Sequence, residues 1–114
     1  MHEASLVKAL LRQVEELANA HNAVGVKQVN VVIGEFSGVE PDLLESAFYR
    51  QTLGTSASGA RICVERAQLM GVCGQCSTEF QIEQFNFQCQ CGSKDVTVTG
   101  GEELMLDSVI METV

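Results

Sequence analysis

Three stretches between residues 26 and 66 decide the fold: VKQVNVVIG (26–34), PDLLESAFYRQTL (41–53) and ARICVER (60–66). The first and the third alternate apolar with polar residues, which is typical of strands. Between them, Pro41 suits the first position of a helix. A strand, a helix and a second strand within about 40 residues predict a right-handed parallel crossover.

Elements on either side extend this unit. Residues 3–22 predict an amphipathic helix. Its apolar face carries Leu6, Leu10, Val14 and Leu17. Residues 103–113 predict a last strand, with one face formed by Leu104, Leu106 and Ile110 and the other by Met105, Val109 and Met111. Because both faces are apolar, we expect the second side of the sheet to be partly covered. The prediction is an α/β fold, a small mixed three-stranded sheet with two helices.

Residues 71–101 differ from the rest of the chain. They contain five of the ten glycines and four of the five cysteines, and they lack helical periodicity. We therefore expect an inserted zinc-ribbon domain at 67–101 and an α/β domain at 1–66 and 102–114. The fifth cysteine, Cys63, is interpreted as a small, partly buried hydrophobic residue.

The four clustered cysteines have the spacing Cys73-x2-Cys76-x12-Cys89-x-Cys91. Two close pairs of thiolates are the usual donor set of a structural Zn²⁺ site, and four sulfur ligands leave no position for a catalytic water. The second pair is one residue closer than the usual Cys-x2-Cys. Residues expected to cover the metal are Phe80, Ile82, Phe85 and Phe87. The alternatives are four unrelated buried cysteines or a redox pair.

Composition excludes several classes of function. Seven Lys and Arg against 15 Asp and Glu give a net charge of −8, which disfavours nucleic acid and anionic membranes as partners. No apolar run approaches the roughly 20 residues of a membrane span. The N-terminal segment lacks the pattern of a signal peptide, so we expect a cytoplasmic protein. Nucleotide-binding glycine motifs and a catalytic constellation are absent from the sequence, so we expect no enzyme.

The sequence begins Met1-His2-Glu3. With His2 second, the α-amine, the following amide and an imidazole nitrogen can form fused chelate rings. Deprotonated amide nitrogen favours square-planar Ni²⁺ or Cu²⁺ over zinc. The Glu3 amide or a carboxylate such as Glu40 could complete the ligand set. The alternative is a frayed terminus, or a histidine that merely caps the helix.

Taken together, four segments resemble one family. They are MHEASL (1–6), the segment VKQVNVVIGEFSGVEPDLLESAFY (26–49), CGSKD (91–95) and GGEELMLDSV (100–109). In this order they resemble the HypA/HybF hydrogenase nickel-incorporation proteins over almost the full length. The departure is the second cysteine pair, where family members usually have Cys-x2-Cys.

The resemblance implies a metallochaperone that delivers Ni²⁺ to the large-subunit precursor of a nickel–iron (NiFe) hydrogenase, working with a HypB-type GTPase. It places nickel on Met1, His2 and Glu3. It places structural zinc on Cys73, Cys76, Cys89 and Cys91. Whether the protein is a homodimer, and whether it also serves urease, is left open by the sequence.

Two other classes of function remain as alternatives. One is a zinc-ribbon adaptor that binds nucleic acid or a transcription complex. Within 71–101, three acidic residues (Glu79, Glu83 and Asp95) stand against Lys94 alone, so that segment offers no basic stripe for phosphates. The more distant alternative is a metal-dependent enzyme.

Overall fold

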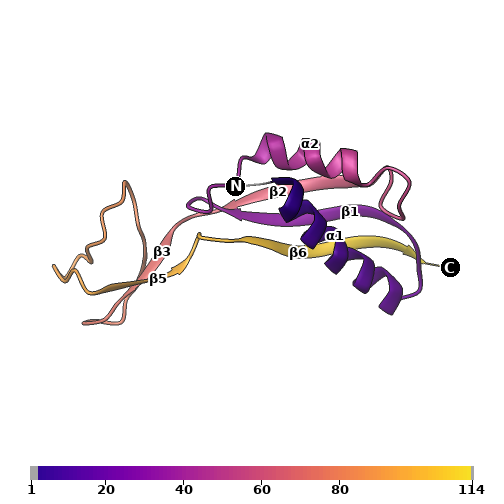
Figure 1. Ribbon diagram of the computed structural model, residues 1–114. Helices are drawn as coiled ribbons and strands as arrows, with labels where there is room; N and C mark the ends of the chain where they lie inside the picture. The colour runs from indigo at the N-terminus through magenta and orange to yellow at the C-terminus, as the bar shows by residue number, and fades with distance from the viewer. Residues whose placement is uncertain (1–2, 114) are drawn as a thin grey trace.

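The computed structural model describes residues 3–113 as an elongated molecule of 55 × 27 × 17 Å (Figure 1). Two helices are present, α1 (Glu3–Ala20) and α2 (Pro41–Gln51). The strands are β1 (Ala23–Gly34), β2 (Arg61–Ala67), β3 (Met70–Cys73), β4 (Glu79–Gln81), β5 (Val96–Gly100) and β6 (Leu104–Thr113). They form two sheets of three strands each, at opposite ends of the long axis (Figure 1).

The larger sheet has the strand order β2-β1-β6. Strand β1 pairs parallel with β2 across the α2 connection and antiparallel with β6. Both helices pack on one face of this sheet, where their apolar residues form a single core with the inward side chains of β1 and β2. The predicted α/β fold with a mixed three-stranded sheet and a parallel crossover is confirmed.

Both helices are rotated slightly from the predicted orientation. In α1 the fully buried positions centre on Val7 and Val14, whereas Leu17 is exposed. In α2, Leu44 and Phe48 are completely buried, but Leu43 is 56% exposed. The predicted apolar stripes therefore included residues at their edges that the core does not reach, because neighbouring leucines cannot all face one sheet.

The predicted faces of the last strand were wrong. Opposite Asn30 and Val31 of β1 lie Ser108 and Leu106, so Asp107 is an extra residue that forms a β-bulge. The bulge reverses the alternation of β6. Leu104, Leu106, Val109 and Met111 all pack against the core.

The opposite face of the sheet is open along the described residues 3–113. Met105 and Ile110 lie there, 54% and 47% exposed. The expectation that this side is partly covered was therefore wrong. That expectation assigned apolar residues of the last strand to both faces of the sheet, because it did not include the bulge at Asp107.

The smaller sheet has the order β4-β3-β5, with both pairings antiparallel. It follows β2 and precedes β6 in the chain. Its buried side chains are few, with Leu69, Cys73, Ile82 and Cys89 all below one tenth exposed. Neither described helix combines the length and the apolar character that crossing a bilayer requires.

Candidate metal centre

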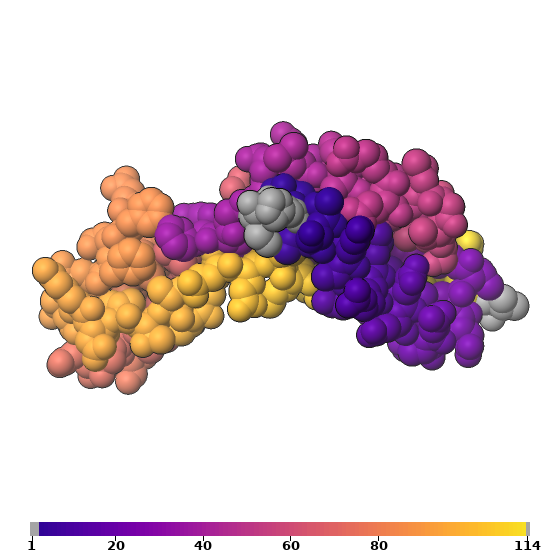
Figure 2. Space-filling view, in the orientation of Figure 1, coloured from indigo at the N-terminus to yellow at the C-terminus, as the bar shows by residue number. Residues whose placement is uncertain are grey.

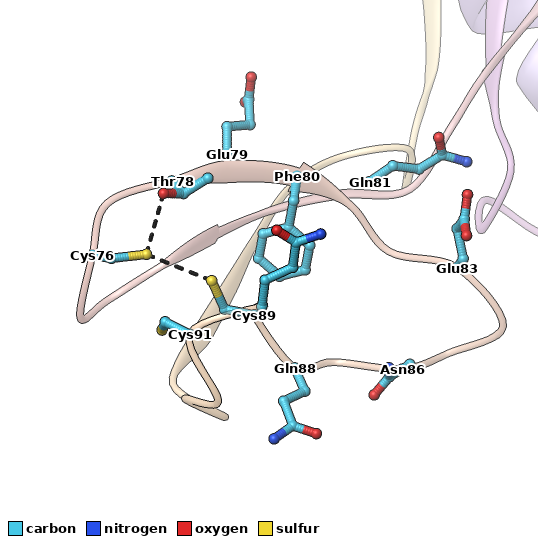
Figure 3. Close-up of a pocket in the computed structure, with 11 residues that line it drawn as sticks. Cys76, Thr78, Glu79, Phe80, Gln81, Glu83, Asn86, Gln88, Cys89 and Cys91 are labelled. Carbon is cyan, nitrogen blue, oxygen red and sulfur yellow. Dashed lines mark hydrogen bonds between the residues drawn. The ribbon is translucent and has the colours of Figure 1, made fainter.

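The four sulfurs of Cys73, Cys76, Cys89 and Cys91 all lie within 4.8 Å of one another at the far end of the smaller sheet. Cys73 ends β3. Cys76 lies in the turn that follows, and Cys89 and Cys91 lie in the loop before β5 (Figure 3). Ligands at about 2.3 Å from a tetrahedral Zn²⁺ stand about 3.8 Å apart. The geometry of this cysteine cluster therefore suits one such ion.

The first pair of ligands lies on a tight turn. The backbone N–H groups of Gln75 and Cys76 donate to the sulfur of Cys73 at 3.3 and 3.5 Å. Such hydrogen bonds stabilise a thiolate and orient it. A Cβ atom at Gly74 would overlap the carboxylate of Asp95, so a larger residue there would displace that side chain.

The second pair reaches the cluster in spite of its short spacing. Cys89 Sγ lies 3.5 Å from Cys76 Sγ, and Cys91 Sγ lies 3.7 Å from Cys73 Sγ. A turn supports this pair, in which Gly92 N–H donates to the Cys89 carbonyl at 2.9 Å. Gly92 has φ +94°, so a residue without a side chain is needed there.

Hydrogen bonds and burial shift the pKa values of the cluster's thiols in opposite directions. The Thr78 hydroxyl, 3.2 Å from Cys76 Sγ, is the main cause that lowers the pKa of Cys76 to about 6. The backbone N–H of Cys76 lowers the pKa of Cys73. At Cys89, the backbone N–H of Cys91 lowers the pKa, but burial and the neighbouring thiols outweigh it and raise the value to about 12. A metal that binds here must therefore displace protons.

Thr78 is the residue of this site that the sequence analysis missed. Its position two residues after Cys76 is the signal that could have identified it, because a hydroxyl at that spacing can reach the thiolate.

The cluster is open on one side. A cavity of about 570 Å³ lies between β4 and the loop that carries Cys89 and Cys91 (Figure 3). Of the residues predicted to cover the metal, Ile82 is buried and Phe80 is half-buried beside this cavity. Phe85 and Phe87 are exposed, so the prediction was wrong for these two.

The predicted nickel ligands Met1 and His2 lie outside the described residues. Glu3 is half-buried and begins α1. The carbonyl of the next residue, Ala4, accepts a hydrogen bond of 2.8 Å from the side chain of Gln51 in α2. Glu40 is exposed at the N-cap position of α2.

Cys63 is half-buried in β2, opposite Asn30 of β1. It lies in the larger sheet, whereas the cysteine cluster lies at the end of the smaller one. Its interpretation as a packing residue agrees with this placement.

Comparison with known proteins places the chain in one family. Residues 1–111 match the family described as "Hydrogenase/urease nickel incorporation, metallochaperone, hypA". The chain is 41% identical to the hydrogenase maturation factor HypA of Nitrosospira multiformis over 114 residues, which are 99% of each chain. It is 40% identical to HypA of Aquifex aeolicus, with 98% of each chain covered.

Solved structures agree. The solution structure of the Ni metallochaperone HypA from Helicobacter pylori is similar, with a TM-score of 0.76, 30% identity and complete coverage of both chains. A second HypA solution structure has a TM-score of 0.75 at 31% identity and covers 97% of this chain and 96% of its own. The resemblance seen in the sequence is thus confirmed, and the chain belongs to the HypA family of nickel-incorporation metallochaperones that act in hydrogenase maturation.

Proposed function

We propose that this protein binds Ni²⁺ and delivers it to the large-subunit precursor of a NiFe hydrogenase. The observation that carries the proposal is the family match over residues 1–111, which spans both the N-terminal chelate and the cysteine cluster. A net charge of −8 further supports a protein that handles cations.

The nickel ligands of this proposal are Met1, His2 and Glu3. The α-amine, backbone amide nitrogens and the His2 imidazole form a nitrogen donor set that suits Ni²⁺. Delivery also requires that the ion can leave, so a site at the chain terminus fits the task better than a closed cage. Glu40 is exposed and can add a carboxylate oxygen.

The cysteine cluster holds Zn²⁺ in this proposal, and its role is structural. Four thiolates complete a tetrahedron, so the bound ion activates no water. The small sheet buries too few apolar side chains to be stable by itself, and metal binding supplies folding free energy. We accordingly divide the chain into a zinc-ribbon domain at 67–101 and a nickel-binding domain at 1–66 and 102–114.

The partners follow from the same role. The absence of a nucleotide-binding motif from the sequence fits a GTPase supplied by a separate protein, which we propose is of the HypB type. The protein itself is a carrier without catalytic activity in this proposal, and it acts in the cytoplasm.

The test compares the two histidines of the chain. We expect His2→Ala to abolish Ni²⁺ binding in calorimetric titration, while zinc content and the thermal unfolding midpoint remain unchanged. His21→Ala is the matched control, since His21 is exposed just after α1, and it should bind nickel like the wild type. In cells at low nickel, His2→Ala should stop hydrogenase maturation. Normal maturation or unchanged nickel affinity in His2→Ala would exclude the proposal.

A further inference from the structure

The loop that follows β1 forms backbone hydrogen bonds with both connections between the two sheets. Glu35 N–H donates to the carbonyl of Ala67, where β2 ends, at 2.7 Å. Phe36 N–H donates to the carbonyl of Gly101, between β5 and β6, also at 2.7 Å. The backbone of this loop is therefore fixed to the chain on its way into the smaller sheet and on its way out.

A pair of aromatic side chains joins the same loop to the ribbon. The ring of Phe36 lies 5.3 Å from that of Phe85, centroid to centroid, at an interplanar angle of 62°. Phe85 belongs to the irregular segment 83–88 between β4 and Cys89. Phe36 and Phe85 remain 50% and 65% exposed, so this edge-to-face contact lies on the surface. Figure 2 shows the purple segment that follows β1 beside the orange segment of the ribbon.

A turn with left-handed backbone presents Phe85. Gln84 and Phe85 have φ values of 53° and 58°, a left-handed conformation that non-glycine residues rarely adopt and a bulky aromatic residue least of all. They are the two central residues of a turn that the Asn86 N–H closes by donating to the Glu83 carbonyl at 2.9 Å, so the turn is locally stabilised and its orientation depends on the two ends of the segment.

Two anchors hold this segment. At one end, Ile82 is buried and its N–H donates to the Leu69 carbonyl at 2.8 Å. At the other end, Cys89 is part of the cysteine cluster. The first anchor belongs to the small sheet, whereas the second depends on what holds the four sulfurs together.

We propose that Phe85 is a positioning residue that docks on Phe36 when a metal ion holds Cys89, so that metal occupancy of the cluster sets the conformation of residues 34–40. Without the metal, the Cys89 end of the segment is released, the turn at 84–85 changes its orientation, and the Phe85 ring leaves Phe36. The consequence for nickel rests on the proposed function, because residues 34–40 end at Glu40. The docking itself does not depend on nickel.

The experiment uses the absence of Trp from the sequence. Phe36→Trp introduces a single indole at the contact. In the zinc-loaded full-length protein, removal of zinc with a chelator should shift the Trp emission to longer wavelength, and re-addition of zinc should reverse the shift. Adding Phe85→Leu should abolish the response. Adding Phe85→Tyr, which retains a ring, should preserve it.

Phe87→Leu is the matched control, because Phe87 is an exposed aromatic residue of the same segment. Phe36→Trp with Phe87→Leu should respond to zinc like Phe36→Trp alone. The reciprocal reporter, Phe85→Trp tested with and without Phe36→Leu, keeps the test valid if the first variant folds poorly. An emission that stays constant while zinc is shown to leave, or a response that survives Phe85→Leu, would overturn the proposal.

A second measurement separates this inference from the proposed function. Hydrogen exchange of the Glu35 and Phe36 amides should become faster in Phe85→Leu and stay at the wild-type rate in Phe87→Leu. His2→Ala should keep the zinc-dependent emission shift. The amide exchange rates and the emission shift therefore report on aromatic docking, whether or not the protein binds nickel.

Discussion

Gly34 and Gly101 meet backbone to backbone at the junction of the two sheets. A Cβ atom on Gly34 would overlap the Gly101 carbonyl group, and one on Gly101 would overlap the backbone of Gln68 and Leu69. Gly101 also has φ +91°, which disfavours any side chain. The end of β1 and the two connections to the ribbon therefore pass each other at a distance that only glycine permits.

Gly34→Ala should destabilise the protein by about 2 kcal/mol, because the added methyl group has to displace backbone atoms. Chemical denaturation monitored by circular dichroism measures the change. Gly25→Ala is the control, since a Cβ atom there has its nearest neighbour at 4.0 Å, the Ser56 carbonyl oxygen. Equal effects of the two substitutions would contradict the close approach.

Two neighbouring leucines of α2 should differ strongly. Leu44 is completely buried in the core, whereas Leu43 is 56% exposed. Leu44→Ala should cost about 3 kcal/mol in the free energy of unfolding, from lost burial and the cavity that remains. Leu43→Ala should cost less than about 1 kcal/mol. Thermal and urea unfolding of the two variants, side by side, test the rotation of this helix.

Loss of one thiol should remove zinc without unfolding the larger sheet. We expect Cys91→Ser to reduce bound zinc from one ion per chain to none. The NMR signals of 71–101 should then lose their chemical-shift dispersion, because this segment unfolds. Signals of the helices and of β1 should persist, because their core contains no cysteine of the cluster. Cys63→Ser is the control and should retain its zinc. A zinc-free Cys91→Ser protein with an intact ribbon spectrum would exclude a structural role for the metal.

Zinc affinity should rise with pH. In the metal-free protein Cys89, with its pKa raised to about 12, holds its proton at neutral pH, and zinc has to displace it. Each displaced proton contributes about tenfold in affinity per pH unit. Below about pH 6 the slope should steepen, because Cys76, with its pKa lowered to about 6, then also binds a proton. Competition with a chelator of known affinity, from pH 5 to pH 8, measures this.

Thr78→Val tests how the pKa of Cys76 contributes to the pH dependence of zinc affinity. Loss of the hydroxyl that lies 3.2 Å from Cys76 Sγ should raise the pKa of that thiol and lower zinc affinity at neutral and acidic pH, because zinc must then displace a proton that the wild-type thiol loses near pH 6. The difference from wild type should fade as the pH rises. Thr55→Val, a change far from the cluster in the loop after α2, serves as the control. An affinity that does not change with pH would contradict proton displacement.

The sequence by itself determined the elements of the larger sheet and the ligands of the cysteine cluster. The periods of 26–34 and 41–53 are local properties, so the crossover could be predicted without knowledge of contacts. The cysteine spacing likewise predicted which four sulfurs meet, because short spacings restrict where thiols can lie. The N-terminal nickel ligands were suggested by their donor chemistry but became a firm expectation only through the family resemblance.

Tertiary structure decided the relationships that depend on pairing and on segments distant in sequence. The bulge at Asp107 arises from the pairing of β6 with β1, and no alternation pattern within β6 alone reveals that one residue is skipped. Phe85 was expected over the metal, but it lies on Phe36, which is 49 residues away in the chain. An aromatic residue in a loop packs its ring against whichever surface the fold brings near, and that surface is set by long-range packing rather than by local sequence.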